Sequence, residues 1–149
     1  MNRVRVTKEF SFEMAHALEG HDGKCRNIHG HSYHLSVTIT GIPIWDALSP
    51  KNGMVMDFAD LKAIVNRTVV EPLDHKLVLL EGSELREGVQ NMPGQPVVFT
   101  PYNPTCENMI IDFAGRIRSE LPEEVTLHSL RLRETQTSYA EWYHNDNDE

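Results

Sequence analysis

Cysteines, long apolar runs and a surplus of basic residues are all lacking or scarce in this sequence. Cys25 and Cys106 are its only cysteines among 149 residues. A chain of this length can build a core without a disulfide, so we expect two free thiols in a reducing compartment. No apolar run approaches the roughly 20 residues that a membrane-spanning helix requires. The opening residues, MNRVRVTKEF, also lack the apolar core of a signal peptide. We therefore expect a cytoplasmic protein with no membrane partner.

The charge balance excludes a further class of protein. Acidic residues outnumber basic ones by 22 to 14, and the formal net charge is −8. A nucleic-acid binder would carry a basic stripe, so we expect no nucleic-acid partner. Basic residues gathered at one place could still bind an anionic small molecule. The length predicts a single domain that spans residues 1–149.

Two segments near the N-terminus alternate between apolar and polar residues, which predicts strands with one buried face. In residues 3–16 the apolar positions are Val4, Val6, Phe10, Phe12 and Met14. From residue 29 onward they are Tyr33, Leu35, Val37 and Ile39. His16 has the parity of the first apolar face, and His29 and His31 have that of the second. Residues 17–28, between the two strands, are expected to form a loop.

Two helices are expected in the remainder of the chain. Asp57 can cap a helix over residues 58–70, which Pro72 is expected to end. Thr105 can cap a second helix, in which apolar residues recur three and four positions apart from Cys106 to Leu121. The polar tail, residues 144–149, is expected to fray.

Further short strands are expected at residues 54–56, 97–99 and 139–143, and a longer one at residues 125–134. Residues 73–103 form the least regular stretch. This order of elements predicts an α+β domain with an antiparallel sheet and both helices on one face. The edges of so small a sheet favour pairing with other copies of the chain.

Three histidines have the spacing of a metal site. His29 and His31 are two residues apart in a predicted strand, so their side chains project to the same side. A hairpin would bring His16 beside them. Three buried imidazoles without a metal would need three separate sets of hydrogen-bond partners. Three nitrogen ligands with a free fourth position are typical of catalytic Zn²⁺, although imidazole also binds iron, nickel and copper.

Other residues offer groups that could move protons or bind a ligand. Cys25 lies four residues before His29, between Lys24 and Arg26, where a metal and two cations would favour the thiolate. Asp74 and His75 supply an adjacent carboxylate and imidazole. Glu134 continues an apolar face, which suggests a buried anchor for the N–H groups of a ligand.

Taken together, these residues resemble the family of 6-pyruvoyl-tetrahydropterin synthase and 6-carboxy-tetrahydropterin synthase. The matching motifs, in order, are FSFEMAH, CRNIHGH, MDFADLK, LDH, PTCEN and LRET, which extend over about residues 10–135. The resemblance implies the tunnelling fold (T-fold), a four-stranded antiparallel sheet with two helices on one side. It also implies that three sheets close into a barrel and that two trimers stack as a homohexamer, with active sites at subunit interfaces.

The resemblance also implies a role for each candidate residue. The zinc ligands it implies are His16, His29 and His31. Cys25 corresponds to the catalytic cysteine, and Asp74 and His75 to an acid–base pair that a neighbouring subunit contributes. The residues that it places around the pterin are Glu134, Thr105 and Glu107, with Glu134 binding the amino-pyrimidinone edge.

The implied substrate is 7,8-dihydroneopterin triphosphate, which loses triphosphate in a lyase reaction. The carboxy enzyme also releases acetaldehyde in the route to queuosine, whereas the pyruvoyl enzyme rearranges the side chain in the tetrahydrobiopterin route. The compact start of the chain favours the carboxy enzyme. We add the hypothesis that Lys24 and Arg26 contact the triphosphate.

Other interpretations of the sequence remain open. A cupin-like iron oxygenase also uses HxH on a strand, but HGHSYHLSV lacks the carboxylate that usually follows. A non-catalytic pterin or metal carrier would have no use for Cys25 or the Asp74–His75 pair. A family variant that feeds folate synthesis has Glu in place of Cys25. Residues 76–103 are longer than compact bacterial members need, and Cys106 lies in an apolar stripe that indicates packing.

Overall fold

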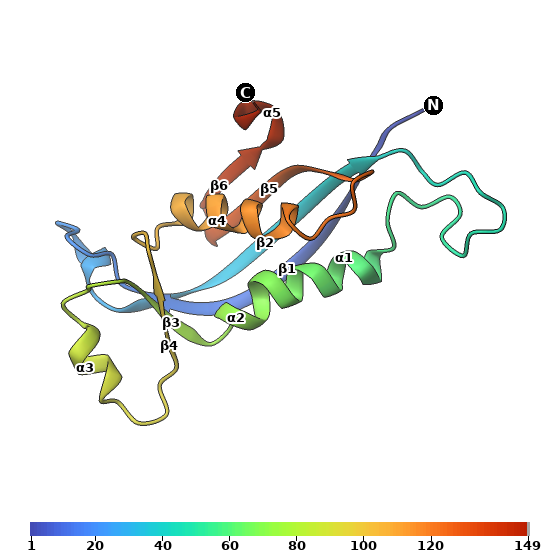
Figure 1. Ribbon diagram of the computed structural model, residues 1–149. Helices are drawn as coiled ribbons and strands as arrows, with labels where there is room; N and C mark the ends of the chain where they lie inside the picture. Colours follow the sequence, from blue (N-terminus) through green and yellow to red (C-terminus); the bar gives the residue numbers. More distant parts are fainter. Residues whose placement is uncertain (149) are drawn as a thin grey trace.

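A six-stranded sheet organises the chain, of which the computed structural model describes residues 1–148 (Figure 1). The strands are β1 (Val4–His16), β2 (His29–Gly41), β3 (Lys76–Leu80), β4 (Val97–Thr100), β5 (Thr126–Thr135) and β6 (Ser138–Tyr143). Their order across the sheet is β4-β3-β1-β2-β5-β6. The architecture is therefore α+β, as the sequence predicts.

Four of the strands form the expected antiparallel sheet. β1 pairs with β2 along its whole length, so that Val4 lies opposite Gly41 and His16 lies opposite His29. β5 pairs with β2 and β6 with β5, both antiparallel. The period-two pattern has the expected effect, since Phe12 and Tyr33 are buried on the face that carries the core.

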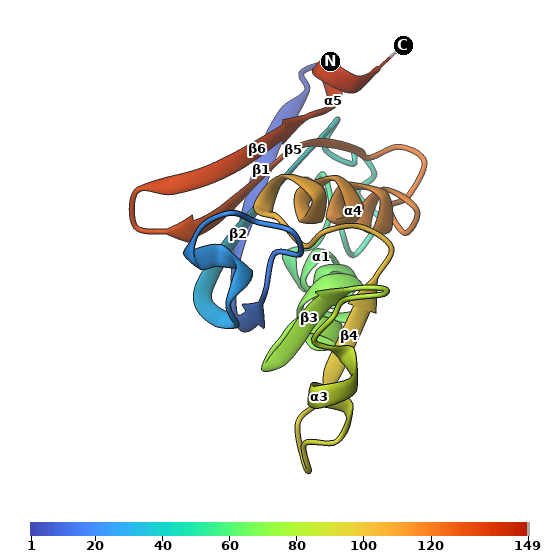
Figure 2. The same cartoon turned by 90° about the vertical axis from the view of Figure 1, so that its left-hand side faces the viewer.

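The four-stranded sheet that the resemblance implies is short by two strands, because β3 and β4 extend the sheet in parallel; β4 agrees with the short strand expected at residues 97–99. β3 pairs with only the last three residues of β1, Met14–His16, and β4 pairs with β3. Leu77, Val78 and Leu79 are all buried in β3. A strand buried on both faces reads as a continuous apolar run without alternation, which is why the period-two pattern misses it. Figure 2 shows β3, β4 and the short helix α3 (Arg86–Gln90) extending away from the antiparallel strands.

Helices cover one face of the antiparallel strands (Figures 1 and 2). The first helical run consists of α1 (Phe58–Val65), a π-helical turn (Asn66–Val70) and α2 (Glu71–Leu73). The second is α4 (Cys106–Arg118). Leu61 and Val65 from α1 and Phe113 from α4 are buried with Phe12 and Tyr33 of the sheet. Both predicted caps are present, since Asp57 accepts from Ala59 N and Thr105 from Asn108 N.

Pro72 does not end the first helical run, contrary to the sequence prediction. The run continues to Leu73, with Pro72 inside the short α2 segment. A proline in a helix leaves the carbonyl four residues earlier without its usual partner, and here that carbonyl belongs to Thr68. Arg116 of α4 donates to it at 3.1 Å. The contact between the two helices therefore satisfies the group that the proline deprives of a partner.

Three other local predictions are wrong. Residues 54–56 are not a strand and lie in the connection between β2 and α1, where Ile44 N donates to Met54 O. The second helix ends at Arg118 instead of reaching Leu121. Within the tail, residues 144–147 form one helical turn, α5 (His144–Asn147), and Glu149 lies outside the described residues. Among residues 1–148, no helix combines the length and the apolar character that crossing a bilayer demands.

Replacing Thr105 with alanine is expected to lower the free energy of unfolding by about 1 kcal/mol, the usual cost of losing a helix cap. The Thr105 hydroxyl accepts from Asn108 N at 3.1 Å, and alanine offers no acceptor. Urea unfolding followed by circular dichroism measures the change. The control is Thr137→Ala in the exposed turn between β5 and β6, which should shift stability by less than about 0.5 kcal/mol. Equal effects of both substitutions would contradict the capping role.

Candidate metal centre

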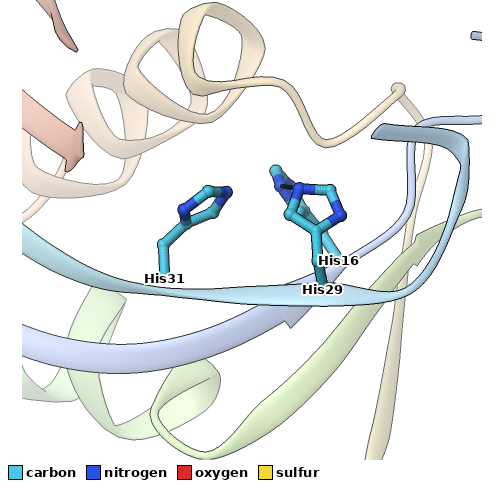
Figure 3. A group of neighbouring side chains, drawn as sticks. All are labelled: His16, His29 and His31. Atoms are coloured by element: carbon cyan, nitrogen blue, oxygen red, sulfur yellow. Dashed lines mark hydrogen bonds between the residues drawn. The ribbon is translucent and has the colours of Figure 1, made fainter. Parts of the chain in front are cut away.

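The end of β1 and the start of β2 bring three histidines together on the helix-covered side of the sheet (Figure 3). His16 lies opposite His29 in the strand register, and His31 follows two residues later on the same face. One ring nitrogen from each histidine can be chosen so that all three lie within 4.8 Å of one another. His16 is 1% exposed, and the other two are partly buried. These three residues could hold a metal ion.

Backbone carbonyls orient two of the rings. His16 Nδ1 donates to Pro104 O and His29 Nδ1 donates to Asn27 O, both at 2.7 Å. Because a carbonyl can only accept, each Nδ1 carries a proton, so that in the neutral imidazole each Nε2 presents a lone pair. The same carbonyl-to-imidazole arrangement orients histidine ligands in many metal sites.

The two lone pairs face each other at short range, and this tests whether a metal fits. His16 Nε2 and His29 Nε2 are 3.1 Å apart. Two acceptors at this distance repel unless a cation lies between them. Two nitrogens bound to one tetrahedral Zn²⁺ at the usual bond length would be about 3.3 Å apart. The donor set and its spacing therefore fit a metal ion.

Burial also favours the metal-binding state of two of the three imidazoles, those of His16 and His31. Desolvation lowers the pKa of His16, although the bond to Pro104 opposes the shift. Desolvation likewise lowers the pKa of His31, against the attraction of the nearby Glu134 carboxylate. Neutral imidazole is the metal-binding form, so the surroundings favour ligation.

Glu134 of β5 forms one wall of this centre. Its Oε1 lies 3.7 Å from Nε2 of His16 and 3.7 Å from Nε2 of His31. Tyr33 is fully buried, and its hydroxyl donates to the same oxygen at 3.2 Å. Burial raises the pKa of Tyr33, so the phenol remains a donor. Sequence reasoning placed Tyr33 only in the core; the available signal was its position two residues after His31 on the same face.

Two further residues that the sequence predicts to belong to the site, Thr105 and Glu107, lie at the start of α4 in different surroundings. Thr105 caps the helix next to Pro104, the residue whose carbonyl orients His16. Glu107 is exposed in the first turn of the helix. Cys106 is buried and donates to Leu132 O at 3.3 Å. Burial raises the pKa of Cys106 to about 12, which agrees with a packing role for this thiol.

Cys25 lies on the connection between β1 and β2, in a single 3-10 turn (Lys24–Arg26). The residue is partly buried, whereas Lys24 and Arg26 are exposed. Its carbonyl accepts from Leu18 N at 2.8 Å. Both Cys25 and Cys106 are free, as expected for a chain without a disulfide. Among residues 1–148, the group of ligand atoms that could hold a metal consists of the three histidines and does not include the Cys25 thiol.

Asp74 and His75 form a pair that lies directly before β3 and is open to solvent. Their Oδ1 and Nδ1 atoms are 2.9 Å apart, and the His75 side chain is 76% exposed. The pair is attached to β1, because Glu13 N donates to Asp74 Oδ1 and His75 N donates to Glu13 O. His75 has φ of 61°, a left-handed conformation that costs about 1 kcal/mol or more and that often occurs at functional sites. Among the described residues no hydrogen bond or ion pair joins this pair to the three histidines, although His75 and His31 line the same pocket.

The Asp74 carboxylate is expected to make stability depend on pH. The Glu13 N–H, and then His75, lower the pKa of Asp74 from its ordinary 3.8. A depressed carboxyl pKa contributes stability above the unfolded-state value and loses it as the pH falls through the folded-state value. The stability difference between the wild type and Asp74→Asn should therefore be largest near neutral pH and shrink below about pH 4. Urea unfolding in the presence of a chelator at several pH values measures this stability difference. The control is Asp146→Asn on the exposed tail, which should show no such trend.

Comparison with known proteins places the chain among relatives. A model of the family described as 6-pyruvoyl tetrahydropterin synthase matches residues 5–145. The 6-carboxy-5,6,7,8-tetrahydropterin synthase of Haemophilus influenzae is 36% identical, and the match covers 93% of this chain and 97% of that protein. The putative enzyme of the same name from Archaeoglobus fulgidus is also 36% identical, over 88% of each chain. The solved 6-pyruvoyl tetrahydropterin synthase of Caenorhabditis elegans has a TM-score of 0.67 at 24% identity, over 96% of each chain, a likeness of fold alone.

Proposed function

Because the chain belongs to the 6-pyruvoyl tetrahydropterin synthase family, we propose that it is a zinc-dependent lyase that converts 7,8-dihydroneopterin triphosphate to 6-carboxy-5,6,7,8-tetrahydropterin. Triphosphate and acetaldehyde would be the other products. The family places the chain among pterin synthases, which act on small-molecule pterins. The choice of the carboxy product rests on one observation, the nearly full-length similarity to relatives with that name.

The proposed metal ligands are His16, His29 and His31, and Zn²⁺ is the ion that three neutral imidazoles with an open position favour. When bound, zinc supplies a Lewis acid that makes the C–H protons beside substrate hydroxyls more acidic. The Pro104 and Asn27 carbonyls hold two of the rings with Nε2 toward the centre. The site therefore requires little rearrangement to bind the ion.

Glu134 is the proposed anchor for the amino-pyrimidinone edge of the pterin. Its carboxylate accepts from Tyr33 and keeps further acceptor positions for N–H groups of a ligand. Thr105 and Glu107 are proposed to line the pterin-binding pocket together with Glu134. With the ring fixed beside the histidines, the side chain of the pterin would extend across the metal centre. Proximity and orientation of this kind account for a large part of enzymatic rate enhancement.

Cys25 is proposed to remove a proton from the pterin side chain, and His75, held by Asp74, to exchange one on the opposite face. The bond between Asp74 Oδ1 and His75 Nδ1 leaves Nε2 of His75 for this task. The exposure of His75 agrees with a pair that serves the site of a neighbouring subunit. Lys24 and Arg26, both exposed beside Cys25, are proposed contacts of the triphosphate.

A homohexamer with interfacial sites is the proposed assembly of chains that each form one domain over residues 1–149. β3 pairs with β1 only at Met14–His16, so much of the outer edge of β1 has no strand partner among the described residues. β6 forms the opposite end of the sheet. Two free edges on one sheet allow copies to join edge to edge. Light scattering coupled to gel filtration should give six times the chain mass; a monomeric mass would contradict this assembly.

Incubation of the purified protein with dihydroneopterin triphosphate tests the proposed reaction. Mass spectrometry should identify 6-carboxytetrahydropterin, and an aldehyde assay should detect acetaldehyde in equal amount. Triphosphate release without acetaldehyde would instead indicate the pyruvoyl product. Binding of zinc and pterin without turnover would indicate a carrier.

Replacing Glu134 with glutamine is expected to weaken pterin binding about 10- to 100-fold, since a hydrogen bond to a charged group contributes about 1.5–3 kcal/mol. Glutamine keeps the size of the side chain and removes the negative charge. Titration of pterin fluorescence measures the dissociation constant. Glu123→Gln, at an exposed position before β5, is the control. Unchanged affinity in Glu134→Gln would remove Glu134 from the pterin site.

A further inference from the structure

The loop that carries Cys25 connects the two strands of the metal centre. We call residues 17–28 the Cys25 loop; it begins directly after His16 and ends directly before His29. Most of its residues are exposed, and Leu18 N donates to Cys25 O at 2.8 Å across the loop. Leu18 is followed by Glu19, so the contacts of Glu19 bear directly on where Cys25 lies.

Glu19 forms a reciprocal pair with Asn103, which lies 84 positions further along the chain. Glu19 N donates to Asn103 Oδ1 at 3.0 Å, and Asn103 Nδ2 donates to Glu19 O at 3.2 Å. Asn103 is itself held at the start of α4, since its carbonyl accepts from Thr105 N at 2.7 Å and from Asn108 Nδ2 at 3.0 Å. The pair thus ties the Cys25 loop to the N-terminal end of α4.

The next residue, Pro104, contacts the metal centre. Its carbonyl accepts from His16 Nδ1 at 2.7 Å. Two consecutive residues therefore contact the two halves of the proposed site. Asn103 binds Glu19 of the Cys25 loop, and Pro104 binds His16. A rigid link of this kind sets the distance between a proton-transfer group and the metal.

The carboxylate of Glu19 makes a second attachment. Ser83, 6% exposed, donates from its hydroxyl to Glu19 Oε2 at 2.9 Å, and Glu84 N donates to Oε1 at 3.4 Å. Both donors lie in the connection between β3 and α3. A buried hydroxyl that loses its acceptor incurs a desolvation cost, so the bond between Ser83 and Glu19 favours one loop position.

We propose that Glu19 and Asn103 are positioning residues that hold the Cys25 loop in register with the metal centre. Glu19 accepts hydrogen bonds from Ser83 and Asn103, which lie on two separate segments. Because the neighbouring Leu18 donates to Cys25 O, fixing Glu19 also restricts the position of Cys25. The inference rests on the proposed role of Cys25 in proton transfer. It assigns no contact of Glu19 with the substrate.

The test compares Glu19→Ala with Glu84→Ala, a neighbouring acid whose carboxylate makes no bond among the described residues. The alkylation rate of Cys25 by iodoacetamide, followed by peptide mass spectrometry, measures how well the loop is held. Buried Cys106 in the same chain serves as the internal reference. Glu19→Ala should alter the Cys25 rate about tenfold, the effect of losing roughly one charged hydrogen bond, and Glu84→Ala should leave it unchanged. Zinc content should stay equal in both.

Kinetics separate positioning from general support of the fold. Glu19→Ala should lower kcat about tenfold with little change in KM, and Glu19→Gln, which retains an acceptor oxygen, should recover part of the loss. In a Cys25→Ser background, the Glu19→Ala change should have no further effect on kcat, since coupled residues are non-additive. An equal loss in both backgrounds would overturn the proposal.

The remaining outcomes are equally decisive. Equal alkylation rates in Glu19→Ala and Glu84→Ala would overturn the proposal, as would loss of zinc from Glu19→Ala alone. If Glu19→Ala fails to fold, Ser83→Ala removes the partner of the Glu19 carboxylate and Asn103→Ala removes the partner of the Glu19 backbone, and each should change the Cys25 alkylation rate in the same direction. Full activity of Cys25→Ser would contradict the proposed function, whereas the alkylation result tests the positioning independently of turnover.

Discussion

Replacing His31 with alanine is expected to abolish zinc binding and to lower turnover by at least about 10³-fold, because Lewis-acid stabilisation contributes several kcal/mol and each 1.36 kcal/mol is tenfold in rate. His31 is the best of the three ligands for this test, since it is partly exposed and its loss leaves the buried His16 in place. Two imidazoles cannot retain the ion at the concentration where three do. Metal content measured by mass spectrometry should fall from one ion per chain to near zero.

The matched control is His34→Ala. His34 lies three residues further along β2, has the opposite parity and is exposed. This variant should retain its zinc and its activity. Full zinc content in His31→Ala would show that His31 is not a ligand. The coordination position proposed to be open to substrate would then have to be assigned again.

Replacing Cys25 with alanine is expected to lower kcat by about 10²- to 10⁴-fold, the usual range for loss of a general acid or base. The zinc content should stay at the wild-type level, because Cys25 is not part of the group of histidines that, among the described residues, could hold the metal. The two variants therefore separate the two halves of the mechanism. His31→Ala should remove the proposed metal, and Cys25→Ala should remove the proposed proton acceptor.

Cys106→Ala provides the control for thiol chemistry. Its thiol is buried and bonded to Leu132 O, so this substitution should cost some stability and leave kcat within about threefold of the wild type, in line with an ordinary core change. Release of triphosphate in a coupled assay measures both variants. Wild-type kcat in Cys25→Ala would show that another group takes the proton.

Alternation along the two N-terminal strands predicts much of the fold and the gathering of the histidines. In a strand, parity alone places a side chain on one face, and it assigns His16, His29 and His31 to the buried side. The caps at Asp57 and Thr105 are equally local, because a cap depends on a side chain and a backbone N–H two or three residues away.

Other elements depend on contacts that no local pattern records. β3 is a short apolar run whose strand character comes from pairing with β1 and β4. The helical run continues past the expected stop at Pro72, and Arg116, on a separate helix, donates to Thr68 O. In each case a distant partner provides the hydrogen bond that local sequence leaves open.

By itself the sequence determined the strand faces, the helix caps, the set of three histidines and, through its ordered motifs, the family. Only the tertiary structure decided that Glu134 and Tyr33 border the histidines, that Asp74 and His75 are exposed beside Glu13, and that Asn103 holds the Cys25 loop. The reason is physical. Side-chain direction repeats with the period of a strand or helix, whereas contacts between residues 84 or 101 positions apart depend on how the elements pack.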